Sequence, residues 1–292
     1  MAERLLMTMA IVLSAGCENG SECYGSVMKE DVMNEMSVSN WNELNDTLFA
    51  NSWSESLGRF RSSYAFRGLA DVADDLRTGL TRLGAPGTEL ERHIIRNFRK
   101  YAHDAVSTDT IWNWLAVAQH HGLPTRLLDW TYSPYVALHF VTESIEDFSN
   151  DGVVLCVDYF RTNAFLPARL KALLEEEGSH VFTVDMLDQV AMSLEEFDLL
   201  SVTEYVAFLE PPSLDARIVN QFALFSLLSH ADARLDTWLK QHPEVYQRIM
   251  IPASLKREIR DKLDQANITE RVLYPGLDGL SRWLKRYYAV QS

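Results

Sequence analysis

Most of the side chains in this sequence that could carry chemistry lie close together, within residues 112–140. His121 could act as a general base, and Asp129 could accept a proton or stabilise a positive charge. Thr131 and Ser133 supply hydroxyl groups that could hydrogen-bond to a ligand. Because these residues surround two expected chain turns, we predict that side chains from separate elements meet there in one pocket.

Local patterns indicate the elements that would position these residues. Helical spacing begins at Trp112 and ends at Gly122, a residue type that favours the left-handed end of a helix. Residues 125–130 combine apolar and polar side chains and predict a short buried strand. Such a strand would deliver Asp129 and Thr131 to an edge of a sheet.

A second helix is expected directly after this strand. Ser133 followed by Pro134 is typical of an N-cap and a first helical position. Unpaired amides at a helix start bind phosphate and other anions, so this turn could hold an anionic ligand. The alternative is that Thr131 and Ser133 only cap the helix and that His121 is a structural residue.

Two further candidates lie outside the dense stretch. Residues 64–68 read as a strand that carries Arg67 next to Gly68, where the backbone can approach another group closely. An arginine can bind a phosphate through two parallel hydrogen bonds. Gln221 begins a predicted strand at residues 221–226, where it is either a strand-edge anchor or a ligand contact.

Composition limits the classes of partner. The chain has 292 residues with 27 Lys and Arg against 41 Asp and Glu, a formal charge of -14. This charge opposes sequence-independent attraction to nucleic acid, so a nucleic-acid substrate would need a local basic surface. The best such surface is one side of a helix predicted at residues 89–103, although a solvated helix flank explains it equally well. Its basic residues are Arg92, Arg96, Arg99, Lys100 and His103.

Cysteine usage favours a reducing compartment. Cys17, Cys23 and Cys156 make an odd number without the spacing of a metal site, so we expect a cytoplasmic protein with no metal. The apolar run at residues 5–15 leaves export or lipoprotein processing through residues 1–17 as the alternative. No other segment approaches the length of a membrane span, and no membrane partner is expected.

The remaining patterns predict an α+β protein: an N-terminal extension at residues 1–34 and a single mixed domain at residues 35–292. A central sheet flanked by helices is expected, because strand and helix patterns mix along the chain. Strands are predicted at residues 64–68, 125–130, 153–157, 204–210, 221–226 and 248–251. Helices are predicted at residues 39–49, 89–103, 254–266 and 276–288 and from Pro167 to about residue 177, whereas residues 181–200 allow no firm assignment.

Four blocks of the sequence, in order, resemble the FRG domain family. They are Phe66–Gly68, which matches the signature that gives the family its name, residues 119–140, residues 217–225 and residues 249–280. The resemblance covers roughly residues 35–290. Leu69 and Ala223 depart from it, because the family usually has Gln and Gly at these two places.

The order of these blocks is also distantly similar to the three-motif layout of ADP-ribosyltransferases. This similarity implies a split antiparallel or mixed sheet and NAD as a substrate. Arg67 and Gly68 would then contact the pyrophosphate or ribose, Thr131 and Ser133 would fix Arg67 or the ribose, and Tyr135 would stack on nicotinamide.

The third motif departs from the transferase pattern. Such transferases usually have a glutamate there, whereas this chain has Gln221, which carries no charge against an oxocarbenium-like ribose. Asp129, Glu204 or Glu210 would have to supply that charge, and Asp129 is the first candidate because it lies in the dense stretch.

The resemblance implies a toxin or phage-defence effector that transfers ADP-ribose to a macromolecule. RNA or DNA is preferred over protein as the acceptor because of the basic helix face from Arg92 to His103. A neutralising antitoxin or chaperone protein would be expected as a partner. Two alternatives remain. One is a non-catalytic module that recognises a nucleotide or phosphate through Arg67, and the other is a hydrolase that uses His121 and Asp129.

Overall fold

The computed structural model describes residues 34–289 except residues 56, 85, 104, 105 and 107. The expected N-terminal extension therefore lies outside the described residues up to residue 33, including Cys17 and Cys23. Within the part that the structure describes, no helix combines the length and apolar character needed to cross a membrane.

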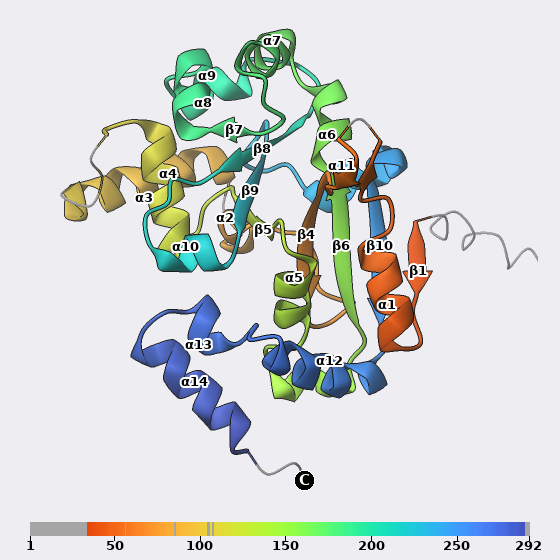
Figure 1. Cartoon of the computed structure of the whole chain (residues 1–292). Coiled ribbons are helices and arrows are strands. Elements are labelled where there is room, and N and C mark those ends of the chain that lie inside the picture. Colours follow the sequence, from red (N-terminus) through yellow and green to blue (C-terminus); the bar gives the residue numbers. More distant parts are fainter. Residues whose placement is uncertain (1–33, 56, 85, 104–105, 107, 290–292) are drawn as a thin grey trace, which may run out of the picture. The chain divides into compact units, whose positions relative to one another are not determined.

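An eight-stranded mixed sheet forms the centre of the domain, in the order β1-β10-β6-β4-β5-β9-β8-β7 (Figure 1). All neighbouring strands are antiparallel except the two edge pairs β1–β10 and β7–β8, which are parallel. The strands are β1 (Glu35–Ser37), β4 (Tyr64–Leu69), β5 (Leu128–Thr131), β6 (Gly152–Asp158), β7 (Phe182–Thr183), β8 (Val206–Glu210), β9 (Ala223–Leu228) and β10 (Tyr246–Ile251). A separate hairpin pairs β2 (Trp53–Ser54) with β3 (Arg59–Phe60).

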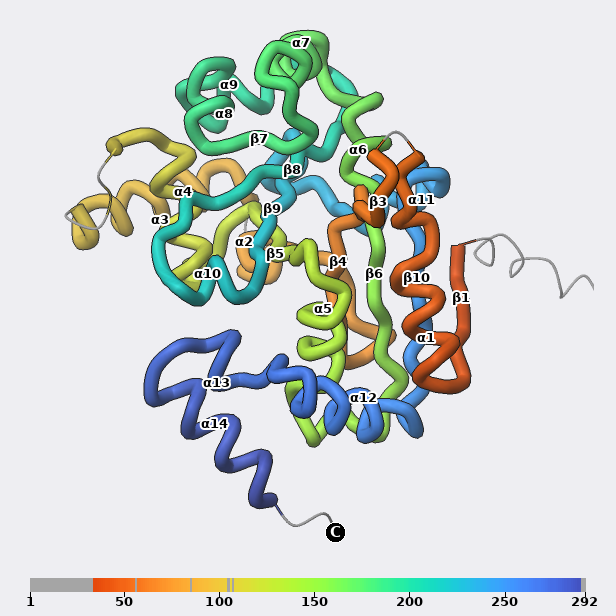
Figure 2. The backbone as a smooth tube through the Cα atoms, in the orientation of Figure 1, coloured from red at the N-terminus to blue at the C-terminus, as the bar shows by residue number. Residues whose placement is uncertain are grey.

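The sheet is joined weakly at its middle. β4 pairs along its whole length with β6, but only Phe66 pairs with β5, opposite Thr131. The strands β1, β10, β6 and β4 therefore form one half-sheet, and β5, β9, β8 and β7 form the other. Figure 2 traces the backbone of both half-sheets, with β5 between β4 and β9.

Helices flank both halves (Figure 1). The α-helices are α1 (Trp41–Leu48), α2 (Gly79–Arg82), α3 (Gly87–Tyr101), α4 (Ile111–His120), α5 (Pro134–Val141), α6 (Tyr159–Thr162), α7 (Ala168–Glu177), α8 (Val184–Val190), α9 (Leu194–Asp198), α10 (Ala216–Asn220), α11 (Leu235–Gln241), α12 (Ala253–Gln265), α13 (Glu270–Leu273) and α14 (Leu277–Tyr287). Three 3-10 turns complete the set: η2 (Ile145–Ser149), η3 (Asn163–Phe165) and η4 (Pro243–Val245). The expected mixed sheet flanked by helices is thus confirmed.

Buried apolar residues attach the helices to the sheet. Phe66 and Ile249 pack against Leu138 of α5 and Ile259 of α12 on one face of the first half-sheet. On the second half-sheet, Leu227 belongs to a cluster with residues of α4, α7 and α8. Such burial is the main stabilising contribution to the fold.

The predicted helix boundaries around the dense stretch are confirmed. α4 ends at His120, and Gly122 has a φ of +78°, the left-handed conformation that glycine adopts without strain. Ser133 caps α5 by accepting a hydrogen bond from the Val136 amide at 3.3 Å, and Pro134 is the first helical residue.

The strand predicted at residues 221–226 begins two residues later than expected. Gln221 is the C-cap of the short helix α10, and β9 begins two residues later at Ala223. Phe222 between them has a positive φ of 48°, which turns the chain from the helix into the strand. The unassigned residues 181–200 form β7, α8 and α9.

Candidate functional site

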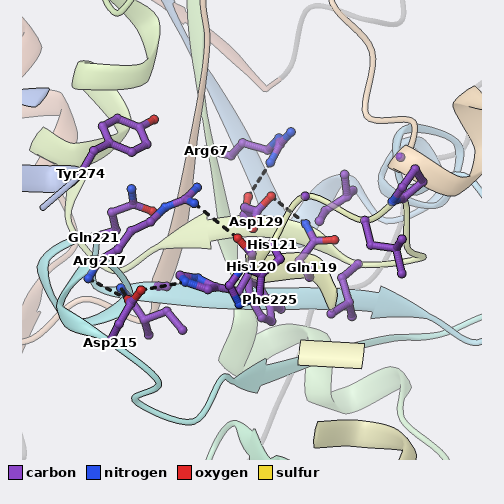
Figure 3. A pocket seen from close by; sticks show the side chains of 18 of the residues that line it. Arg67, Gln119, His120, His121, Asp129, Asp215, Arg217, Gln221, Phe225 and Tyr274 are labelled. Atoms are coloured by element: carbon purple, nitrogen blue, oxygen red, sulfur yellow. Dashed lines mark hydrogen bonds and ion pairs between the residues drawn. The ribbon is translucent and has the colours of Figure 1, made fainter. Parts of the chain in front are cut away.

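A cavity of about 1050 Å³ lies where the two half-sheets meet (Figure 3). Its lining comes from β4, β5 and β9, from α2, α10 and α14, and from the C-terminal end of α4. Five arginines line it: Arg67, Arg77, Arg82, Arg217 and Arg282. His120 and His121 also line the cavity, together with Asp129, Asp215 and Asp278. A strongly acidic protein therefore concentrates positive charge in one hollow, as expected for a site that binds an anion.

Arg67 bridges the gap between the half-sheets. Its Nη1 donates to the backbone oxygen of Asp129 at 2.6 Å, next to the point where the β4–β5 pairing stops. Its Nε is buried and has no hydrogen-bond partner among the described residues. Burial lowers the pKa of Arg67, partly offset by the nearby Asp129 carboxylate, but an arginine stays charged at neutral pH.

The Asp129 carboxylate is exposed in the cavity and is oriented by Gln119. Gln119 Nε2 donates to Asp129 Oδ2 at 2.8 Å. The amide oxygen of Gln119 accepts from the hydroxyl of the buried residue Thr125. Because this bond fixes which end of the amide faces Asp129, the carboxylate always receives a donor.

A second pair of titratable groups lines the same cavity. His120 Nε2 and Asp215 Oδ2 are 2.8 Å apart, and only 8% of the His120 side chain is exposed. Asp215 also caps α10 by accepting from the amides of Arg217 and Ile218. Burial raises the pKa of Asp215, but these amides and His120 outweigh it and hold the pKa below its usual value. Asp215 is therefore ionised at neutral pH and orients the imidazole.

An aromatic ring flanked by two arginines forms the opposite part of the lining. The guanidinium carbons of Arg217 and Arg282 lie 5.2 Å and 5.0 Å from the centre of the Tyr274 ring. Burial and a hydrogen bond to Glu143 raise the pKa of Tyr274, so its phenol stays neutral. Arg217 Nη1 also donates to the His120 backbone oxygen at 3.3 Å.

One segment of the chain that lines this cavity matches a known domain family. Residues 62–150 match the family model of the FRG domain. This segment is an FRG domain. The match confirms the resemblance over that segment, which contains Arg67, Gln119 and Asp129 but none of the residues of α10, α13 or α14. No curated protein and no solved structure gives a significant match.

The hydroxyls expected beside Arg67 do not line the cavity. Thr131 is 2% exposed, and its Oγ1 donates to the Gln221 backbone oxygen at 2.7 Å and accepts from the Ser133 amide at 3.0 Å. The Ser133 hydroxyl is occupied as the cap of α5. Both hydroxyls therefore satisfy backbone groups, and the Thr131 hydroxyl also links the FRG segment to Gln221 outside it.

Tyr135 and Gly68 also lie away from the cavity lining. Tyr135 points toward α1, where its hydroxyl donates to Asn45 Oδ1 at 2.7 Å and its ring stacks on Trp41 at 6.0 Å. Gly68 is required by packing, because a Cβ at this position would lie 1.9 Å from the Ala137 backbone oxygen of α5. Neither residue is part of the cavity lining.

Gln221 lines the cavity, but its amide holds another element in place. Gln221 Nε2 donates to the Leu273 backbone oxygen at 2.9 Å, and Asn220 Nδ2 donates to Val272 at 2.7 Å. These two bonds anchor α13, which precedes Tyr274. Gln221 is thus a positioning residue for the wall that carries Tyr274 and Arg282.

His121 and Asp129, the two residues of the hydrolase alternative, both line the cavity, but no hydrogen bond joins them among the described residues. The His121 ring lies against the His120 ring at 5.1 Å, and Asp129 is held by Gln119. In this cavity, His120 pairs with the carboxylate of Asp215. His–Asp proximity could not be inferred from the sequence, because Asp215 lies far along the chain.

Sequence reasoning missed most of the basic lining. Arg77 and Arg82 were not among the residues expected in the site, and both pair with Asp75. The basic side of α3, which was preferred as the anion-facing surface, lines a different hollow next to Arg126. Among the described residues, no cluster of three or more His, Cys, Asp or Glu could hold a metal ion.

Proposed function

We propose that the cavity binds NAD as a substrate and that the protein transfers ADP-ribose to a macromolecule. The observation that carries this proposal is the placement of Arg67 beside an exposed Asp129 carboxylate in a cavity with four further arginines. NAD combines two phosphates with a ribose that becomes positively charged during cleavage. Arginines suit the phosphates, and a carboxylate suits the ribose.

The residues that line the cavity have different parts in this proposed reaction. Arg67, with Arg77 and Arg82 in the same lining, would hold the pyrophosphate. Asp129, oriented by Gln119, would stabilise the positive charge on the ribose as the bond from C1′ to the nicotinamide nitrogen breaks. Neutral nicotinamide leaves with the bonding electron pair.

Transfer is completed when the acceptor forms a bond to C1′. The acceptor loses a proton at this step, and the His120–Asp215 pair supplies a base for it at 2.8 Å separation. In this scheme Asp129 takes the place of the glutamate that ADP-ribosyltransferases usually have in their third motif. The joint between the half-sheets supports the similarity to the split sheet of those enzymes.

An enzyme of this kind would act as a toxin or phage-defence effector in the cytoplasm. Its acceptor would be RNA or DNA rather than protein, and a neutralising antitoxin or chaperone would protect the host. The five cavity arginines support an anionic acceptor as well as an anionic donor.

The test is incubation with adenine-labelled NAD and separate RNA, DNA and protein acceptors. We expect nicotinamide release together with label on one acceptor class. Arg67→Ala and Asp129→Asn should each lower the transfer rate at least about a hundredfold. Arg169→Ala on α7, an exposed arginine outside the cavity, is the matched control. Absence of both NAD cleavage and NAD binding would reject the proposal.

One observation favours a second candidate, a nucleotide-recognition module without catalysis. Arg77 and Arg82 are held by Asp75, and Arg67 is held by a backbone oxygen, so these three arginines are already arranged to bind a phosphate. Calorimetry with NAD, ADP-ribose and ADP separates the two functions. Tight binding of all three, with no nicotinamide released from NAD, would favour the module.

A further inference from the structure

We infer that the wall formed by Arg217, Tyr274 and Arg282 binds a backbone phosphate of the acceptor, an unpaired RNA or DNA strand. The inference rests on the proposed function, because it assigns the opposite wall to NAD. We call these three residues the C-terminal wall and call Arg67, Arg77 and Arg82 the FRG wall. All six residues line the same cavity. Figure 3 labels Arg67, Arg217 and Tyr274 of them.

The arginines of the two walls differ in their partners. Asp75 forms ion pairs with Arg77 at 2.5 Å and with Arg82 at 3.0 Å, so much of that positive charge is balanced. Over the described part of the chain, neither Arg217 nor Arg282 forms an ion pair with a carboxylate. The C-terminal wall therefore carries the less compensated charge of the cavity.

The Tyr274 ring arranges the two guanidinium groups. Both lie within about 6 Å of one ring centre, the range in which the aromatic face attracts a cation. Each guanidinium carries five N–H donors, so the single bond from Arg217 to the His120 backbone leaves donors for a phosphate.

The C-terminal wall is also held rigidly against the rest of the domain. Arg286 of α14 forms ion pairs with Asp264 of α12 at 2.7 Å and with Glu270 of α13. Gly279 packs so closely that an added Cβ would lie 1.8 Å from the Tyr274 backbone oxygen. A preformed pair of cations loses little freedom on binding, which favours a defined phosphate position.

Charge and shape together select the kind of acceptor. With a net charge of -14, the protein surface as a whole repels nucleic acid, and attraction is confined to the cavity. A concave site admits an unpaired nucleotide, whereas a base in a duplex must first leave its stack. A strand whose phosphate lies on Arg217 and Arg282 would pass next to His120, which Arg217 contacts.

Fluorescence anisotropy with labelled ten-nucleotide RNA and DNA single strands tests the inference. We expect Arg217→Ala and Arg282→Ala to weaken strand binding at least about tenfold, as for the loss of a charge-assisted hydrogen bond. The slope of log K against the logarithm of the salt concentration should become less steep by about 0.7 for each phosphate contact removed. Arg282→Lys should recover the charge but only part of the affinity, because it lacks the planar fork.

Lys285→Ala is the matched control, since Lys285 is an exposed cation on α14 outside the cavity lining. It should bind the strand as the unchanged protein does. A duplex of the same sequence should bind at least about tenfold more weakly than the single strand. Thermal melting of every variant checks that the fold is kept.

NAD affinity measured on the same proteins separates this inference from the proposed function. The inference requires that Arg217→Ala and Arg282→Ala lose at least about tenfold more affinity for the strand than for NAD. Equal losses would assign the C-terminal wall to NAD and overturn the inference, as would label transfer to protein without strand binding. If these variants weaken strand binding but the protein neither binds nor cleaves NAD, only the proposed function fails.

Discussion

Arg67 and Asp129 are joined through the backbone oxygen of Asp129, at 2.6 Å, and not through its carboxylate. The guanidinium thus links β4 to β5 where their strand pairing ends, while the carboxylate receives Gln119 and remains exposed in the cavity. This residue pair therefore bridges the two strands and also offers a guanidinium and a carboxylate to a ligand.

Arg67→Lys separates these two contributions. A lysine can donate to the Asp129 backbone oxygen as a point charge, but it lacks the planar fork that binds a phosphate through two bonds. We expect NAD affinity to fall at least about tenfold while the unfolding free energy falls by less than about 1 kcal/mol. Calorimetry and urea unfolding measure the two quantities. Equal NAD affinity in the lysine variant would show that no bidentate contact is made.

Asp129→Asn tests whether the carboxylate acts on the transition state. Asparagine can still accept a hydrogen bond from Gln119, so the local geometry should be kept. We expect kcat for NAD cleavage to fall about a hundredfold or more with KM changed by less than about threefold. A variant with an unchanged kcat would remove Asp129 from the chemical step.

Gly68→Ala should act through folding. The added Cβ meets the Ala137 backbone oxygen of α5 at 1.9 Å, so α5 or β4 must shift. We expect a loss of at least about 1–3 kcal/mol in unfolding free energy. Gly122→Ala is the comparison, because its positive φ costs about 1–2 kcal/mol but nothing lies within 4 Å of the added atom. A larger loss at Gly122 than at Gly68 would contradict this account of α5 packing.

The local elements around the site could be predicted, whereas the convergence of its residues could not. Gly122 and the Ser133–Pro134 pair act on their own few residues, so sequence alone placed the end of α4 and the start of α5. Thr131 could not be assigned correctly, because a threonine that caps a backbone group and one that binds a ribose look alike in sequence.

The partners across the cavity depend on tertiary structure. Arg217 and Arg282 meet at Tyr274 only because α13 is anchored to the end of α10, through bonds that no local pattern encodes. Tyr135 was expected in the pocket but faces α1, because the apolar face of α5 determines its direction. Helical spacing indicates a buried face but not which neighbour covers it.

His139 predicts a pH dependence of stability. Burial, and next the Arg260 guanidinium, lower the pKa of His139 from 6.5 to about 3. The unfolded chain therefore binds one more proton than the folded chain between these two values, so stability falls as pH drops below 6.5. Urea unfolding from pH 7 to pH 4 should show a contribution of about 1.4 kcal/mol per pH unit. In His139→Gln, which cannot titrate, the slope should be smaller by about that amount, and equal slopes would contradict the assignment.

Gln221→Glu tests whether this chain can use a transferase-like third motif. In the structure Gln221 Nε2 donates to the Leu273 backbone oxygen at 2.9 Å, and that bond holds α13. A glutamate would place a carboxylate oxygen against this carbonyl, so we expect a loss of about 1–3 kcal/mol in unfolding free energy and weaker strand binding. Because the new charge would face α13, NAD cleavage should not increase. Gln221→Met, which removes the donor without adding charge, is the control. A rise in kcat specific to the glutamate variant would show that position 221, rather than Asp129, faces the reacting ribose.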